Sequence, residues 1–166
     1  MDAVEIGRTL AERISDSGHD WPGPPLNENP IWLRKVAAQA VAILREDPVL
    51  YVGHTVEKGS DEEGQTTYEG EVIIATADQM LYSTILTTDV TTEAYGLNEV
   101  TALQVVDVDD FPGRDVAWPR NICFNVTLRN AVIRFPASTD ASPVQDQEAG
   151  VMLTHLNAAL RSPSRR

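Results

Sequence analysis

The sequence predicts an α+β fold in which two N-terminal helices precede about seven short antiparallel strands and one C-terminal helix. Three changes of pattern support this prediction. Apolar residues recur at helical spacing up to residue 46, alternate with a period of two after residue 49, and return to helical spacing after residue 143. A bent sheet of this size needs its apolar face covered, so we expect the last helix to close one open end.

The first helix is expected over residues 2–17, with Gly18 as its C-terminal stop. Four prolines bar a helix in residues 19–30, which are interpreted as a linker. Asn29 and Pro30 are a typical helix start, and the second helix is expected to run to about Glu46. The buried face of the first helix should comprise Val4, Leu10, Ala11 and Ile14. That of the second should comprise Ile31, Leu33, Val36, Ala37, Ala40, Val41, Ile43 and Leu44.

The middle of the chain is predicted to form short strands. Expected strands cover residues 49–56, 68–76, 80–86, 98–108, 121–128 and 132–135, with a threonine-rich β segment over 84–92. The polar segment 57–65 is interpreted as a hairpin loop, and 109–120 as a second loop. Within 121–128, the alternation predicts that Ile122, Phe124, Val126 and Leu128 share one face.

The C-terminal helix has the clearest start signal. Ser142 is a capping residue, Pro143 suits the first turn, and Gln145 completes a capping box. Its apolar face is expected to comprise Val144, Met152, Leu153, Leu156 and Leu160. We therefore expect a helix over residues 143–161.

Composition excludes several classes of partner. The chain has 166 residues and a formal net charge of −12, and residues 49–137 alone hold 14 acidic and 5 basic side chains. A phosphate backbone or an anionic membrane surface would be repelled, so nucleic-acid binding is disfavoured. No apolar stretch predicts membrane insertion, and the N-terminal residues do not resemble a secretory signal, so a cytoplasmic location is expected.

No motif predicts catalysis, a cofactor or a metal site. His19, His54 and His155 lack metal-ligand spacing, and His54 is expected to be a packed strand residue. Cys123 is expected to be a structural cysteine in a strand. The acidic run that begins at Asp107 does not fit a calcium loop. The protein is therefore expected not to be an enzyme, and no cofactor is predicted.

The loop 111–120 combines aromatic and basic residues within an acidic stretch. Phe111, Arg114, Trp118 and Arg120 belong to residue types that are enriched at binding hot spots. These four residues are the candidate binding site. The alternative interpretation is that Phe111 and Trp118 fold back to cover one end of the sheet.

The strand block resembles a bacterial pleckstrin homology-like (PH-like) domain. The segments 70–82, 98–106 and 126–135 are similar to that family's strand–turn–strand, central strand and last hairpin. The resemblance covers about residues 49–161 and implies a bent antiparallel sheet or barrel with the helix at 143–161 as its cap. It divides the chain into an N-terminal helical pair (1–47), a PH-like domain (48–161) and a short basic tail (162–166).

The resemblance implies binding of proteins or peptides rather than lipids. Phosphoinositide-binding members carry basic residues in the first hairpin loop, whereas this loop holds Glu57, Asp61, Glu62 and Glu63 against a lone Lys58. The leading hypothesis is thus a non-enzymatic protein- or peptide-binding module.

Two alternatives stay open: a small acidic inhibitor or immunity-type protein that neutralises a basic partner, and a ligand carrier or enzyme with a cavity inside the curved sheet. The N-terminal helices either pack on the domain or join a second copy in a homo-oligomer.

Overall fold

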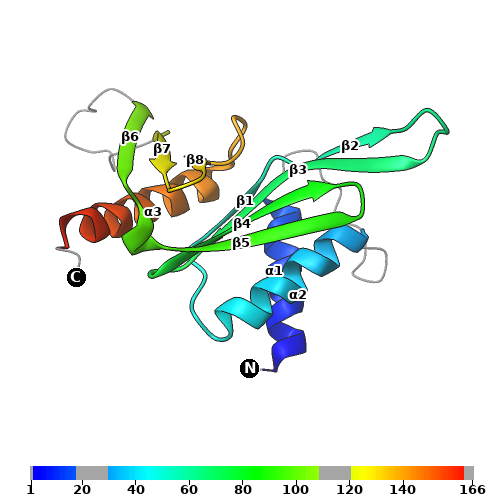
Figure 1. Cartoon of the computed structure of the whole chain (residues 1–166), viewed down its shortest axis with the longest axis horizontal. Helices are drawn as coiled ribbons and strands as arrows, with labels where there is room; N and C mark the ends of the chain where they lie inside the picture. Colours follow the sequence, from blue (N-terminus) through cyan, green and yellow to red (C-terminus); the bar gives the residue numbers. More distant parts are fainter. Residues whose placement is uncertain (1, 18–29, 109–120, 163–166) are drawn as a thin grey trace.

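The computed structural model describes residues 2–17, 30–108 and 121–162, and it confirms an α+β architecture (Figure 1). The helices are α1 (Ala3–Asp16), α2 (Ile31–Leu44) and α3 (Pro143–Arg161), with a 3₁₀ turn, η2 (Leu97–Glu99). The strands are β1 (Tyr51–His54), β2 (Glu57–Ser60), β3 (Thr66–Ala75), β4 (Gln79–Leu86), β5 (Asp89–Gly96), β6 (Ala102–Asp107), β7 (Cys123–Thr127) and β8 (Val132–Phe135).

The strands form two antiparallel sheets instead of one bent sheet. The larger sheet has the order β1-β3-β4-β5, and β2 pairs with the first half of the long strand β3. The smaller sheet has the order β6-β7-β8. The single sheet or barrel expected from the sequence is therefore corrected to two unclosed sheets, because η2 interrupts the pairing after β5.

The hairpin loop is shorter than expected. Residues 57–60, which the sequence predicts to be part of a loop, form strand β2 and pair with residues 66–69. The turn itself is fixed by Asp61, whose carboxylate accepts hydrogen bonds from the backbone N–H groups of Glu63 and Gln65. A polar composition concealed this strand because both of its faces are exposed to water.

One hydrophobic core lies between the two sheets and under α3. Phe135 stacks on Phe124 with ring centroids 5.1 Å apart and contacts Tyr51 at 4.8 Å. The Tyr51 hydroxyl accepts a hydrogen bond from the backbone N–H of Ala137 at 2.7 Å, so this buried polar group is satisfied. The core includes Ile122, Phe124, Val126 and Leu128, which confirms the alternation predicted for β7.

A second core lies between the other face of the large sheet and helices α1 and α2. The helices contribute Leu10, Ala11, Ile14, Trp32, Leu33, Val36, Ala37, Ala40 and Leu44, and the sheet contributes Val52, Val56, Val72, Ile74, Leu81 and Ile85. Trp32, which is 1% exposed, was not among the predicted core residues. Both faces of β1 are buried, because Tyr51 enters the core between the sheets and Val52 enters the core under the helices.

Several predicted apolar positions are instead exposed. Val4 is 68% exposed, because only the second half of α1 reaches the sheet. Ile31 and Ile43 of α2 are also exposed. The linker 19–29 and the proposed stop at Gly18 lie outside the described residues.

Helix α3 begins as predicted and packs differently from the prediction. The Ser142 hydroxyl accepts from the Gln145 N–H, and the Gln145 side chain accepts from the Ser142 N–H, which confirms the capping box. The buried face comprises Gln145, Ala149, Met152 and Leu156, whereas Val144 and Leu160 are exposed. Within the described residues, no helix is long and apolar enough to cross a membrane.

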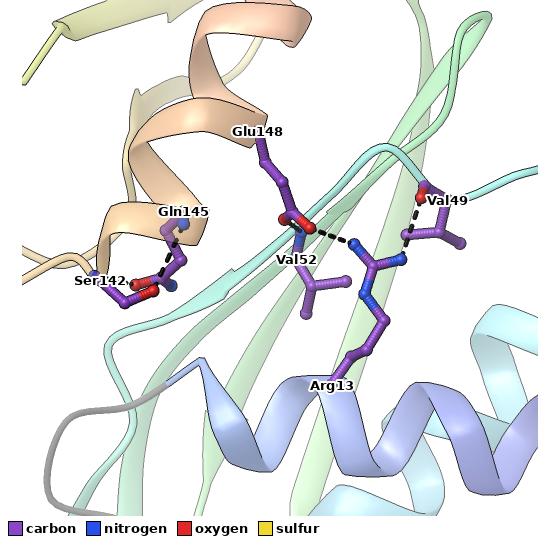
Figure 2. Close-up of polar contacts among 6 residues, drawn as sticks. All are labelled: Arg13, Val49, Val52, Ser142, Gln145 and Glu148. Carbon is purple, nitrogen blue, oxygen red and sulfur yellow. Dashed lines mark hydrogen bonds and ion pairs between the residues drawn. The ribbon is translucent and has the colours of Figure 1, made fainter. Parts of the chain in front are cut away.

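An ion pair joins α1 to α3 across the edge of the large sheet (Figure 2). Arg13 Nη2 lies 2.6 Å from Glu148 Oε1, and Arg13 Nη1 donates to the Val49 carbonyl at 2.9 Å. Glu148 Oε2 accepts the backbone N–H of Val52 at 3.2 Å. Because β1 is an edge strand, these bonds satisfy backbone groups that no neighbouring strand pairs.

Replacing Glu148 with alanine should lower the free energy of unfolding by about 2 kcal/mol, because Val52 N–H and Arg13 both lose an acceptor. Glu148→Gln keeps an acceptor and should lower it by only about 1 kcal/mol. Urea denaturation of both variants measures the difference. Equal losses in the two variants would show that the acceptor at this edge contributes nothing.

Candidate functional site

The two faces of the large sheet are covered to different extents. Helices α1 and α2 lie against one face (Figure 1). On the opposite face, the residues that enter the inter-sheet core are Tyr51, Ile73, Ala75, Met80 and Tyr95, all at one end of the sheet. The other end of that face, towards the β2–β3 and β4–β5 turns, extends beyond the small sheet and α3. Part of this face is therefore open to a partner.

The strand register gathers carboxylates on this open part. Glu57 pairs with Glu69, Glu69 pairs with Leu86, and Leu86 pairs with Asp89, so these side chains share one face. Alternation along β3 and β5 places Glu71 and Glu93 on the same face. We call this surface the acidic face, and it comprises Glu57, Glu69, Glu71, Asp89 and Glu93.

No basic side chain offsets these charges within the five strands of the large sheet. Lys58 is the only lysine or arginine in β1–β5, and it pairs with Tyr68 on the opposite face. Four of the five carboxylate residues are exposed and Glu71 is partly buried. Leu86, which is 61% exposed, lies among them as an apolar contact point.

Two tyrosines orient carboxylates at the inner border of the acidic face. The Tyr82 hydroxyl donates to Glu71, and the Tyr95 hydroxyl donates to Glu93 at 2.7 Å. Burial raises the pKa of Tyr82, with the bond to Glu71 as a further cause, and the bond to Glu93 raises the pKa of Tyr95. Both phenols thus stay protonated as donors, and each carboxylate keeps acceptor capacity for an incoming cation.

The cysteine and the histidines of the described residues lie outside the strands that carry the acidic face. In the described residues, no three His, Cys, Asp or Glu side chains form a group that could hold a metal ion. Cys123 is buried in β7, and His155 is half-buried on α3. His54 is buried in β1, as expected, and its Nδ1 accepts the Val56 N–H at 3.1 Å.

The four predicted binding residues, Phe111, Arg114, Trp118 and Arg120, lie outside the described residues, so they stay a prediction.

The acidic face was missed by sequence reasoning. Its signal was the alternate placement of Glu69 and Glu71 in β3, but only the register shows that Glu57, Asp89 and Glu93 join them.

Two cavities are described, and both border α1 instead of the interior of a sheet. One, of about 310 Å³, lies between α1 and the C-terminal part of α2 and includes Leu10, Leu44 and Pro48. The other, of about 440 Å³, lies along the first turns of α1 and includes Val4, Gly7 and Val41.

Two sequence comparisons with known proteins find no match. No protein-family model matches the chain, and no curated protein is significantly similar to it in sequence.

Proposed function

We propose that the chain is a non-enzymatic protein-binding module of the PH-like type that takes a basic partner on its acidic face. The carrying observation is that five carboxylates share an open sheet face without a basic side chain from the strands of that sheet. A partner that presents lysines and arginines would gain charge-assisted hydrogen bonds there.

The PH-like part of the proposal is supported by the order of the elements. A meander that ends with β5 is followed by a second meander, β6-β7-β8, and then by α3, which packs on the core between the sheets. The tip of the first hairpin carries Asp61, Glu62 and Glu63, all exposed, so an anionic lipid headgroup would be repelled there.

The charges on the acidic face would act mainly on association. Exposed carboxylates lose little hydration before contact, and their summed field draws a basic partner towards the face. Because such charges are screened by salt, the complex should weaken as ionic strength rises. Leu86, which is exposed among these carboxylates, would supply an apolar contact.

The mutational test removes three charges from the acidic face. The triple variant Glu69→Gln, Asp89→Asn, Glu93→Gln should bind a captured basic partner with an affinity about 10- to 100-fold lower than that of wild type. The reason is that each exposed ion pair contributes about 0.5–1 kcal/mol to binding. The measurement is affinity capture from cell extract followed by titration of the captured protein.

The matched control changes the same number of charges elsewhere. Glu46→Gln, Glu62→Gln, Glu63→Gln alters three exposed carboxylates outside the face and should change affinity by less than about 3-fold. A complex that is indifferent both to the triple face variant and to 0.5 M salt would contradict the proposal.

The acidic inhibitor remains an alternative that uses the same face. It differs in one outcome, because an inhibitor would abolish an activity of the captured partner whereas a scaffold would leave it intact. An assay of the captured partner with and without this protein distinguishes the two.

A further inference from the structure

The first two turns of α1 extend beyond the core. Leu10, Ala11, Ile14 and Ser15 are the buried residues of this helix, and none of them lies in its first half. Val4 is 68% exposed, the largest exposed fraction among the large apolar side chains of the described residues. Val4 therefore presents most of its apolar surface to water in a single copy of the chain.

The 440 Å³ groove runs beside these exposed turns. Its walls are small or apolar, with Ala3, Val4 and Gly7 from α1 and Ala38 and Val41 from α2. A Cβ added at Gly7 would lie 3.6 Å from Val41 Cγ2, in ordinary contact, so the two helices approach closely at this point. Small side chains leave room for the backbone of a further helix.

The charges that line this groove are positive in a chain that is otherwise acidic. Arg8 and Arg34 line it and no acidic residue does. Both arginines are exposed, and within the described residues neither makes an ion pair or a side-chain hydrogen bond. A complementary occupant is therefore an amphipathic helix with carboxylates.

Helix α1 itself has this chemistry. Its first turn is capped by Asp2 and carries Glu5, which follows the groove-lining Val4. Glu5 is exposed and has no ion-pair partner among the described residues. In an antiparallel pair of α1 helices whose twofold axis passes between Ile6 and Gly7, Glu5 of each copy lies opposite Arg8 of the other.

We propose that two copies of the chain form a symmetric dimer in which the first turns of each α1 lie in the α1–α2 groove of the other copy. The contact buries Val4, and the twofold symmetry forms the Glu5–Arg8 pair twice. The helices lie on the opposite side of the large sheet from the acidic face, so the dimer leaves that face open. The inference is therefore independent of the proposed function.

Charge reversal with rescue tests the dimer. The full-length chain should have twice its 18.2 kDa mass by sedimentation equilibrium. Arg8→Glu alone and Glu5→Arg alone should each weaken dimerisation at least about 30-fold, because two pairs become repulsive in each dimer. The double variant Glu5→Arg, Arg8→Glu restores both pairs and should restore the dimer.

Controls separate loss of the dimer from loss of the fold. Arg129→Glu changes the charge of an exposed residue far from α1 in sequence and should leave the dimer intact. Arg34→Glu reverses a charge on α2 and should weaken the dimer without touching the N-terminal turn of α1. Circular dichroism must show unchanged helix content in every variant. Three results would overturn the proposal. The first is a monomeric wild-type chain at about 100 μM, a concentration far above the dissociation constant of a stable dimer. The others are a dimer that Arg8→Glu does not weaken and a double variant that does not restore the dimer.

Discussion

Replacing Gly70 with alanine is expected to lower the free energy of unfolding by about 3 kcal/mol. Gly70 lies in β3 opposite the break between β1 and β2, and its φ is 148°. A Cβ there would lie 2.6 Å from the Thr55 carbonyl oxygen and 2.6 Å from Val56 Cα, both backbone atoms. Because backbone atoms move less readily than a side-chain tip, the sheet must shift to accept the methyl group.

Gly150→Ala is the matched control for this substitution. Gly150 lies inside α3, and an added Cβ meets no atom within 4 Å. Alanine favours the helix, so this variant should be more stable than wild type by about 0.5–1 kcal/mol. Urea denaturation of both variants gives the comparison. A Gly70→Ala protein as stable as wild type would show that β3 does not pass close to residues 55 and 56.

Stability should fall by about 2 kcal/mol between pH 7 and pH 5 on account of His54. Burial lowers the pKa of His54 from 6.5 to about 4. Between these two values the unfolded chain binds a proton that the folded chain excludes, so stability increases with pH. The contribution is complete above pH 6.5 and is lost as the pH falls towards 4.

The variant His54→Gln removes this titration and retains an oxygen that can accept the Val56 N–H. Its stability at pH 7 should be lower than that of wild type, because the contact of the His54 ring with Trp32, at 6.4 Å between centroids, is lost. Between pH 7 and pH 5, the variant should lose about 2 kcal/mol less unfolding free energy than wild type does. Urea titrations of both proteins at pH 7, 6 and 5 measure this difference. If wild type and variant lost the same unfolding free energy over this range, His54 would not be a buried neutral histidine.

Local signals in the sequence predicted the elements that depend on local physics. The serine–proline–glutamine pattern at residues 142–145 predicted the start of α3, and strict alternation predicted the core face of β7. Capping and alternation depend on a few neighbouring residues, so they can be predicted without knowledge of the tertiary structure. The same signals failed for Val4, which matches the helical pattern but lies in the half of α1 that holds no buried residue.

Long-range features could not be predicted from these patterns. The division into two sheets depends on η2 and on the pairing of β3 with both β1 and β2, which has no single local signal. The acidic face depends on the register of four strands, since a shift of one residue in β5 would turn Asp89 and Glu93 to the opposite face. The four candidate residues of the loop 111–120 remain untested.

Carboxyl footprinting of the complex tests the acidic face most directly. Carbodiimide coupling of glycine ethyl ester labels exposed carboxylates, and mass spectrometry reads each position with and without the captured basic partner. The account predicts protection of Glu57, Glu69, Asp89 and Glu93, with unchanged labelling of Glu62 and Glu63 at the hairpin tip. Protection confined to the hairpin tip, or no protection at the four face positions, would contradict it.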